Sequence, residues 1–446
     1  MVNKIVLNDD ILSILNSIKN KGYTALVVGG YIRDSLLGIT PHDCDIATNC
    51  SYDELLEIFK GYNPKEIGKS FGIIQIKINN VEYEIAKFRT DGVYSDSRRP
   101  DTVEFVDNFY EDAKRRDFTI NAMGYDGAKL YDYFKGQEDL ANGLIRFVGI
   151  GKERINEDAL RMLRAIRFST KMSNLELYNP TFDNISVMSH GIKYISEERV
   201  RLELDKILLS DYPSKGIRLL QQTGLLKYII PELNECVGFN QNNSHHNKDL
   251  LEHILTVVDH TKPILVNRLS ALLHDIGKVS THSLDENGES HYYLHHKVSA
   301  DMAGEILTRL KYDNKTIETV KRLIYDHMNK NSKQSDKVIK RFVIRVGVEN
   351  LPNMFDLLQA DIIGHKPPHN FKSLDNLKQK CYDIINREEP IKTSQLVING
   401  RDIMDLGIKE GKLIGELLEI CMNRVLDNPD YNNKDYLIKL IMDEIN

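Results

Sequence analysis

The sequence lacks the features that mark secreted, membrane-spanning and zinc-ribbon proteins. Its five cysteines, Cys44, Cys50, Cys236, Cys381 and Cys421, are scattered and form no CxxC pair. This dispersed, odd-numbered set argues against a disulfide framework and favours reduced thiols. No apolar run is long enough to cross a bilayer, so no membrane partner is expected. The opening residues MVNKIVLNDD show no hydrophobic stretch followed by small residues, which predicts no secretory signal and a cytoplasmic location.

An excess of positive charge is also missing. The net charge is -6, which by itself argues weakly against a nucleic-acid partner. Several basic residues nevertheless stand close together between residues 89 and 171, as Arg89, Arg98, Arg99, Lys114, Arg115, Arg116, Arg146, Lys152, Arg154, Arg161, Arg164, Arg167 and Lys171. Because a solvated charged face would give the same pattern, the motifs have to decide between the two.

A change of periodicity along the chain predicts an α+β protein of several domains. A chain of 446 residues exceeds the size of a single core. After Gly151 the pattern is helical almost throughout, whereas before residue 145 it is mixed. In the mixed part we predict a helix at 9–20, strands at 23–30 and 42–48, a helix between them, and strands at 71–79 and 81–89 joined by the hairpin signal Asn79-Asn80.

The first candidate site combines a glycine pair with two aspartates. Gly29 and Gly30 stand between a predicted strand and a helix, where backbone amides can approach a triphosphate. A turn without any ligand would also explain them. On the predicted strand at 42–48, Asp43 and Asp45 project to one face and Cys44 to the other. Two carboxylates on one face require a counter-ion, and Mg²⁺ shared with substrate phosphates fits them.

These segments carry a family resemblance. VVGGYIRDSLLG followed by HDCDIAT resembles the head of the polymerase-beta superfamily of nucleotidyltransferases, in particular the class that contains bacterial CCA-adding enzymes and poly(A) polymerases. The resemblance implies that Asp43 and Asp45 are catalytic and hold Mg²⁺, and that Gly30 and Arg33 contact the triphosphate. Glu84 would supply a third carboxylate, although an exposed strand glutamate explains it nearly as well.

A second motif extends the resemblance. RRDFTINAM at 115–123 looks like the family segment in which Arg116, Asp117 and Asn121 would hold the phosphates and the ribose hydroxyl. The alternative is a basic N-cap followed by an ordinary helix.

The segment EDALRMLRAIRF at 157–168 predicts how a base would be selected. At helical spacing Glu157, Arg161, Arg164 and Phe168 fall on one face. Asp158 stands beside Arg161. Such a pattern usually forms an ion-paired surface helix. Here the neighbouring predicted metal site favours a base-selecting role instead.

The chemistry of an aspartate–arginine pair suits cytosine and adenine. Both bases present an amino donor beside a ring-nitrogen acceptor, which an aspartate and an arginine complement. Guanine and uracil present the opposite pattern, and buried mismatches of this kind reject a wrong substrate by about 10⁴. In the family, Asp158 and Arg161 match the positions with that role, and Arg164 and Arg167 lie nearby.

Two segments favour CCA addition to tRNA from CTP and ATP over related activities. Residues 91–105 look like the flexible loop that CC-adding relatives lack, and residues 68–79 resemble the CCA-adding version of that region. A poly(A) polymerase would be more basic, in order to bind arbitrary RNA. An enzyme that adds only the terminal A remains an alternative.

ALLHDIGK at 271–278 resembles the centre of an HD domain, a metal-dependent phosphohydrolase fold. Neutral imidazoles with carboxylates suit a divalent transition metal that activates water against a phosphate. Its expected substrate is a phosphate or 2′,3′-cyclic phosphate at a damaged RNA end. A scaffold without metal is the alternative, and so is an HD hydrolase as the main activity. In family order the ligands would be His253, His274, Asp275, His295, His327 and Asp361, with His295 preferred over its neighbour His296.

The resemblance covers nearly the whole chain and predicts its organisation. We expect a nucleotidyltransferase head at 1–148, a helical neck and RNA-binding segment at 149–240, an HD-containing body at 241–366 and a tRNA-binding helical tail at 367–446. A non-catalytic RNA-binding protein with a relict head is disfavoured, since the carboxylates, the phosphate loop and the base-selecting segment all remain together.

Overall fold

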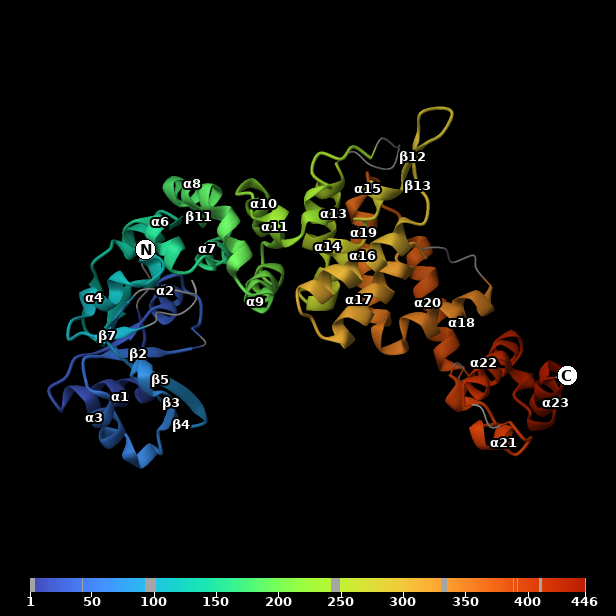
Figure 1. Ribbon diagram of the computed structural model, residues 1–446, viewed down its shortest axis with the longest axis horizontal. Coiled ribbons are helices and arrows are strands. Elements are labelled where there is room, and N and C mark those ends of the chain that lie inside the picture. The colour runs from blue at the N-terminus through green and yellow to red at the C-terminus, as the bar shows by residue number, and fades with distance from the viewer. Residues whose placement is uncertain are drawn as a thin grey trace. The chain divides into compact units, whose positions relative to one another are not determined.

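A computed structural model describes residues 5–41, 43–92, 102–241, 249–329, 335–387, 389–390, 392–408 and 411–445. The chain divides into two compact units, Met1–Asn234 and Glu235–Asn446 (Figure 1). Most of the predicted loop at 91–105, namely residues 93–101, lies outside the described residues. No described helix is long and apolar enough to cross a membrane. The division into four domains stays a prediction.

A mixed seven-stranded sheet forms the head of the first unit, in the order β3-β4-β5-β2-β1-β8-β9. Strands β2 and β5 are parallel, and all other neighbours are antiparallel. The predicted α+β class is confirmed. The strands are β1 (Ala25–Val28), β2 (Asp45–Thr48), β3 (Lys65–Gly68), β4 (Ile73–Ile78), β5 (Val81–Lys87), β8 (Met123–Tyr125) and β9 (Leu130–Asp132), with a separate pair β6 (Arg89–Asp91) and β7 (Val103–Phe105).

The locally encoded elements of the head form as predicted. The amphipathic helix is α1 (Asp9–Lys19), whose buried side chains recur at helical spacing. Strands β4 and β5 meet at Asn79 and Asn80, whose φ angles of 47° and 67° are those of the hairpin turn that asparagine favours. Strand β1 is entirely buried, and it ends at the glycine pair.

Two predicted boundaries are wrong. Strand β2 begins at Asp45 rather than at 42, because Asp45 pairs with Val28, the last residue of β1, and no residue of β1 is left to pair with Asp43. The predicted continuous helix at 157–168 is broken at Asp158, which is extended with φ -150° and ψ 104°. Its Oδ1 accepts the backbone N–H of Leu160 at 3.0 Å, a local bond with which aspartate commonly competes with helix.

Helices connect and follow the strands of the sheet in the first unit, and some of them line the pocket described below. Besides α1, these helices are α2 (Gly30–Leu36), α3 (Tyr52–Ile58), α4 (Phe109–Lys114), α5 (Gly136–Ala141), α6 (Gly151–Glu157), α7 (Arg161–Ser169), α8 (Asn179–Met188), α9 (Glu197–Leu208), α10 (Pro213–Gln222), α11 (Leu226–Ile229) and α12 (Pro231–Asn234). The unit also contains the short strands β10 (Leu144–Ile145) and β11 (Glu176–Leu177).

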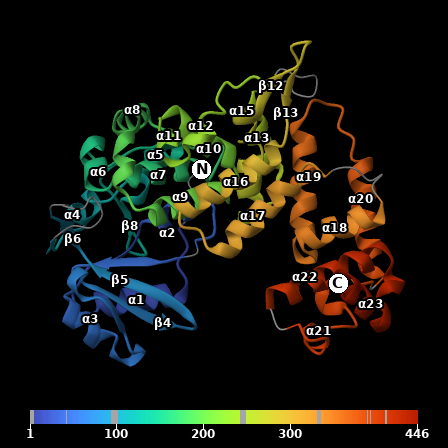
Figure 2. The same cartoon turned by 45° about the vertical axis from the view of Figure 1, so that its right-hand side comes forward.

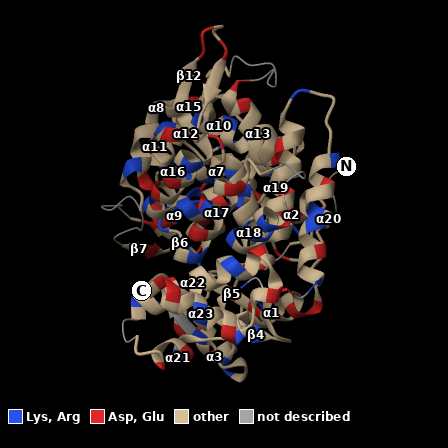
Figure 3. Cartoon of the chain, turned by 90° about the vertical axis from the view of Figure 1, so that its right-hand side faces the viewer, with Lys and Arg blue, Asp and Glu red and all other residues tan. Residues whose placement is uncertain are grey.

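The second unit is almost entirely helical, as predicted, and its only described strands form one hairpin (Figure 2). Acidic and basic residues are interspersed along the helices (Figure 3). Its elements are α13 (Leu250–His260), α14 (Leu265–Leu273), α15 (Lys278–Thr281), β12 (His282–Leu284), β13 (Ser290–Tyr292), α16 (His295–Arg309), α17 (Asn314–Asp326), α18 (Asp336–Val346), α19 (Leu351–Gly364), α20 (Lys372–Asn386), α21 (Gly400–Met404), α22 (Gly411–Asp427) and α23 (Lys434–Ile445).

Candidate functional sites

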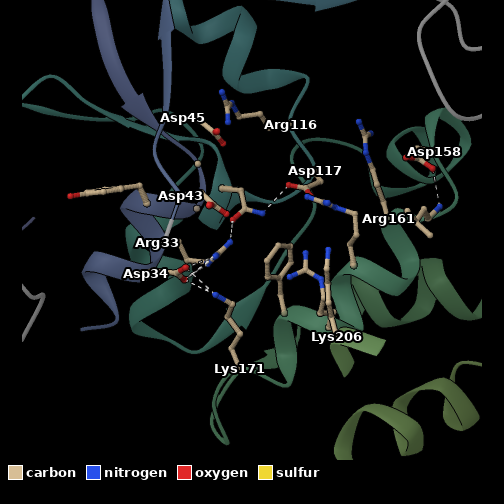
Figure 4. Close-up of a pocket in the computed structure, with 18 of the residues that line it drawn as sticks. Arg33, Asp34, Asp43, Asp45, Arg116, Asp117, Asp158, Arg161, Lys171 and Lys206 are labelled. Atoms are coloured by element: carbon tan, nitrogen blue, oxygen red, sulfur yellow. Dashed lines mark hydrogen bonds and ion pairs between the residues drawn. The ribbon is translucent and has the colours of Figure 1, made fainter. Parts of the chain in front are cut away.

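A polar pocket of about 800 Å³ in the first unit gathers every head residue predicted from the motifs except Glu84 (Figure 4). The volume suits a bound small molecule, and the excess of cations suits a polyanion. The basic side chains that line it are Arg33, Arg89, Arg115, Arg116, Arg161, Arg164, Arg167, Lys171, Arg199 and Lys206. The acidic ones are Asp34, Asp43, Asp45, Asp117 and Asp158, and Gly29, Gly30 and Asn121 complete the predicted set.

The glycine turn lies directly beneath an arginine. Gly29 has φ 70°, a left-handed conformation that disfavours other residues. A Cβ on Gly29 would come within 3.2 Å of Nη1 of Arg116. Because Gly29 has no side chain, the backbone amides of the turn stay accessible beside the guanidinium group of Arg116. Accessible amides and a nearby cation at the start of a helix are what a bound phosphate needs.

Three carboxylates gather at the edge of the pocket. Asp43 and Asp45 line it together and Cys44 does not; Cys44 lines a second cavity, which Asp43 also borders. Glu84 is the register partner of Asp45 on the parallel neighbour strand. Desolvation raises the pKa of Asp45, Arg116 lowers it, and Asp43 raises it again; the pKa of Glu84 is raised by desolvation and then by Asp45 and Asp43. Mutual repulsion of this kind is relieved by a bound cation, so the donor set fits a divalent metal ion.

Asp117 organises the centre of the pocket. Its Oδ2 accepts from Nε and Nη2 of Arg164 at 2.8 and 2.6 Å. Its Oδ1 accepts from the side-chain amide of Asn121 at 3.0 Å, and Asn121 in turn accepts from Arg33 at 2.6 Å. Although burial raises the pKa of Asp117, Arg164 and Asn121 outweigh it and hold the pKa well below its usual range. One ionised carboxylate thus fixes residues from three different elements.

Phe168 supports the arginines from below. The guanidinium carbons of Arg167, Arg33 and Arg164 lie 4.0, 4.6 and 5.6 Å from the centre of its ring. Cations over an aromatic face gain electrostatic attraction. Arg167 also pairs with the buried Glu203 at 2.6 Å. This negative charge and the aromatic ring together offset the repulsion among the three guanidinium groups at the pocket wall.

The predicted base-selecting residues are both held by other protein groups. Asp158 accepts from Nη2 of Arg199 at 2.7 Å. Arg161 pairs with Glu157 and donates to the carbonyl oxygens of Arg154 and Arg115 at 3.0 and 3.2 Å. A carboxylate has about four acceptor sites and a guanidinium five N–H groups, so each retains capacity for a ligand.

Sequence reasoning missed several pocket residues. Arg199 and Lys206 lie on α9, a segment that was matched only as the helical neck. Asp34 pairs with Arg33 at 2.8 Å and with Lys171 at 2.9 Å. Arg199 meets Asp158 across 41 positions of sequence, and no local pattern signals such a contact.

The six predicted HD residues meet in one buried cluster in the second unit. They form two triads, one of His253, His274 and Asp361 and one of Asp275, His295 and His327, in which ligand atoms lie within 4.8 Å of one another. His296 is not in the cluster, and burial lowers the pKa of its imidazole.

Asp275 belongs to the second triad and also lies close to the two histidines of the first. Its Oδ2 is 3.2 Å from Nε2 of both His253 and His274, and its Oδ1 is 3.3 and 3.6 Å from Nε2 of His295 and His327. Ligand atoms bound about 2.1 Å from one ion lie about 3–3.5 Å apart. One carboxylate therefore reaches both candidate metal positions.

The tautomers of the four histidines suit metal binding. Each Nδ1 lies beside a backbone carbonyl oxygen, at 3.2 Å for His253, 2.8 Å for His274, 2.8 Å for His295 and 2.6 Å for His327. A carbonyl only accepts, so each Nδ1 donates and the inward Nε2 is left with a lone pair. Nε2 atoms of His253 and His274 are 3.3 Å apart; burial lowers the pKa of His253, but Asp275 and Asp361 raise it further, so the surroundings favour a cation on this pair of nitrogens, either a proton or a metal ion.

Comparisons with known families match the head and two later segments of the chain. Residues 25–146 match the poly(A) polymerase head domain, residues 174–237 the probable RNA and SrmB-binding site of polymerase A, and residues 289–441 the tRNA nucleotidyltransferase domain 2. The polymerase head implies metal-dependent catalysis, and the His/Asp triads are further candidates for metal binding.

The chain also resembles whole proteins. A Bacillus stearothermophilus CCA-adding enzyme solved in complex with CTP shares the fold, with a TM-score of 0.73 and 24% identity over 97% of this chain and 96% of the other. The Staphylococcus aureus (strain Newman) CCA-adding enzyme is 42% identical over 48% of this chain and 54% of its own. The CCA-adding enzyme of Ligilactobacillus salivarius (strain UCC118) is 32% identical over 96% of this chain and 94% of its own. The chain belongs to the family of CCA-adding enzymes, the tRNA nucleotidyltransferases with a poly(A) polymerase head.

Proposed function

We propose that this protein adds C, C and A to the 3′ end of tRNA from CTP and ATP, without a nucleic-acid template. The observation that carries the proposal is the pocket itself, which combines a carboxylate cluster, a bare glycine turn beneath Arg116 and the pair Asp158 and Arg161. The relatives named for CCA addition support it, and one similar structure, with a TM-score of 0.58, is a Thermotoga maritima enzyme complexed with tRNA. A cytoplasmic location accords with a tRNA substrate.

In the proposed reaction the tRNA 3′-hydroxyl attacks the α-phosphate of the nucleotide and pyrophosphate leaves. Asp43 and Asp45, with Glu84 beside them, would hold Mg²⁺. When bound, this ion supplies charge that favours the attacking alkoxide and offsets the leaving pyrophosphate. Arg116 and Arg33 bind and orient the triphosphate. Positioning and charge neutralisation supply most of the acceleration in such reactions.

Base selection rests on fixed partners around Asp158 and Arg161. Arg199 holds Asp158 in place at 2.7 Å, and Glu157 and two backbone carbonyls hold Arg161. The amino group of cytosine or adenine donates to the carboxylate of Asp158, and the neighbouring ring nitrogen accepts from the guanidinium of Arg161. Guanine and uracil leave these polar groups unpaired, which costs affinity.

The direct test is single-nucleotide addition to tRNA transcripts that end before CCA, after C and after CC, with each nucleotide offered alone. Extension of all three, with a stop after one A, is the expected result. Growth of the CC-ended transcript alone identifies an A-adding enzyme, and continued adenylation identifies a poly(A) polymerase.

Replacing Arg161 with alanine should relax nucleotide choice. Its guanidinium meets the ring acceptor that distinguishes C and A from U and G, so the preference for CTP over UTP is expected to fall at least about tenfold, or about 1.4 kcal/mol. The affinity for tRNA should stay within about twofold in a binding assay. Unchanged rejection of UTP and GTP by the folded variant would refute the base-selecting role.

A second candidate function is favoured by the His/Asp cluster. The four inward Nε2 atoms and the bridging Asp275 fit two divalent transition metal ions. Bound there, the ions would activate water against a phosphate ester. Oδ1 of Asp275 is buried and accepts no hydrogen bond within the described residues, as expected of a ligand atom. The proposed substrate is a terminal phosphate or a 2′,3′-cyclic phosphate on RNA.

A further inference from the structure

A buried carboxylate outside the pocket holds two of the arginines that line it. Asp112 on α4 is 1% exposed. Its Oδ1 accepts from Nε and Nη2 of Arg115 at 3.0 and 2.9 Å and from the backbone N–H of Arg89 at 3.3 Å. Its Oδ2 accepts from Nε and Nη2 of Arg116 at 3.3 and 3.0 Å. All five donors are directed at a single side chain.

These bonds are charge-assisted and lie in a region shielded from water. Burial raises the pKa of Asp112, but Arg116 and Arg115 outweigh it, so the pKa lies below its usual value and the group is ionised at neutral pH. Removing one partner of such a buried pair leaves the other charge uncompensated. Asp112 therefore determines where the guanidinium of Arg116 can lie, which is over the turn at Gly29.

The same end of α4 also supports the base-selecting side of the pocket. The backbone carbonyl of Arg115 accepts from Nη2 of Arg161 at 3.2 Å, and that of Lys114 accepts from Nη1 of Arg154 at 3.0 Å. Arg154 in turn gives its own carbonyl oxygen to Arg161 at 3.0 Å. The phosphate-binding arginine and the carbonyls that hold Arg161 thus belong to one short segment.

We infer that Asp112 is a positioning residue that couples phosphate binding to base selection, by fixing Arg116 over the triphosphate site and the carbonyls at 114–115 beside Arg161. This inference rests on the proposed nucleotidyltransferase function. It predicts a joint defect: loss of Asp112 disturbs both halves of the pocket, whereas loss of Arg116 or Arg161 disturbs only one.

The test is the variant Asp112→Asn, which keeps the shape and removes the charge. With CTP on a tRNA that ends before CCA, KM should rise about tenfold with a smaller change in kcat, and the preference for CTP over UTP should fall about tenfold. Calorimetry with inorganic tripolyphosphate should show weaker binding without any turnover. Arg116→Ala should weaken tripolyphosphate binding alone, and Arg161→Ala should alter the CTP preference alone.

Asp139→Asn is the matched control. Asp139 is 2% exposed and pairs with Arg146 at 2.9 Å, but it does not line the pocket. This variant should lose thermal stability to a similar degree while KM and CTP preference stay at wild-type values. Asp112→Glu retains the buried charge while displacing the arginines, and it replaces Asp112→Asn if that variant does not fold; its defects should be smaller and in the same directions.

Wild-type tripolyphosphate affinity and CTP preference in the folded Asp112 variants would overturn the inference. A change in only one of the two quantities would overturn the coupling, and so would a loss of activity that merely follows the folded fraction, as in the control. A wild-type protein that binds tripolyphosphate but adds no nucleotide to any tRNA transcript would contradict the proposed function instead, and the two failures are thereby distinguished.

Discussion

Replacing Asp45 with alanine is expected to slow nucleotide addition by at least about 10³-fold, or about 4 kcal/mol in the activation free energy. Asp45 is paired in register with both Val28, next to the glycine turn, and Glu84, so it stands where the phosphate site meets the carboxylates. A metal ion loses a ligand in this variant, and the attacking and leaving oxygens lose its charge. Single-turnover incorporation of CTP at saturating nucleotide measures the effect.

Two readouts separate this catalytic loss from a folding defect. Burial raises the pKa of Asp45, and Asp43 adds to this against the opposing effect of Arg116; the ionised carboxylate is therefore unfavourable in the folded state, and the metal-free Asp45→Ala variant should melt no lower than wild type. Glu82→Ala is the control on the neighbouring strand β5, because Glu82 is exposed and pairs with Lys65 at 3.4 Å; its rate should be that of wild type. Turnover by Asp45→Ala above about a tenth of the wild-type rate would exclude a metal-binding role.

Features that depend on neighbouring residues were predictable from the sequence. Asn79-Asn80 forms a hairpin because both residues tolerate positive φ. Gly29 likewise marks the turn after β1, because glycine tolerates positive φ. Strand alternation placed Asp43 and Asp45 together, and both line the pocket while Cys44 does not, although Asp43 precedes the strand rather than belonging to it and also lines the second cavity beside Cys44.

Features that depend on distant partners were not predictable. The break at Asp158 is stabilised by Arg199, which lies 41 residues away, while the local pattern alone favoured one continuous helix. Asp112 is an ordinary helix residue in the sequence, and its role follows only from the fold that brings Arg89 to it. Pocket residues on α9 were missed because a helical pattern predicts which face of a helix is buried but not which other elements that face contacts.

The His/Asp cluster is an intermediate case. The family resemblance supplied its six members in order, but no spacing shows which of them share an ion. The fold supplies that answer, since His253 and His274 stand on one side of Asp275 and His295 and His327 on the other. The backbone carbonyls that orient each ring are equally invisible in the sequence, because any residue can provide one.

Replacing Asp275 with alanine is expected to abolish binding of both metal ions and with it any phosphohydrolase activity. Oδ2 faces one triad and Oδ1 the other, so a single substitution removes a ligand from each. His253→Ala and His327→Ala should each lose mainly one ion, since each belongs to one triad. Metal content of the purified protein, opening of a 2′,3′-cyclic phosphate to a monophosphate at an RNA end and release of inorganic phosphate from a terminal phosphate are the measurements. Removing a metal ligand typically costs at least about 10–100-fold in affinity.

The control and the opposite outcome separate a metal centre from a hydrogen-bonded scaffold. His260→Ala is the control. His260 lies on the same helix as His253, but it is exposed and bonds only locally, so the metal content of this variant should not change. In a scaffold without metal, Lys278 at 2.7 Å from Asp275 would be its main counter-charge, and Asp275→Ala would lower stability without any change in metal content or hydrolysis. CCA addition should persist in every folded variant of the cluster, because the carboxylates at Asp43 and Asp45 belong to the other unit. Loss of addition together with loss of metal would instead show that one centre serves both reactions.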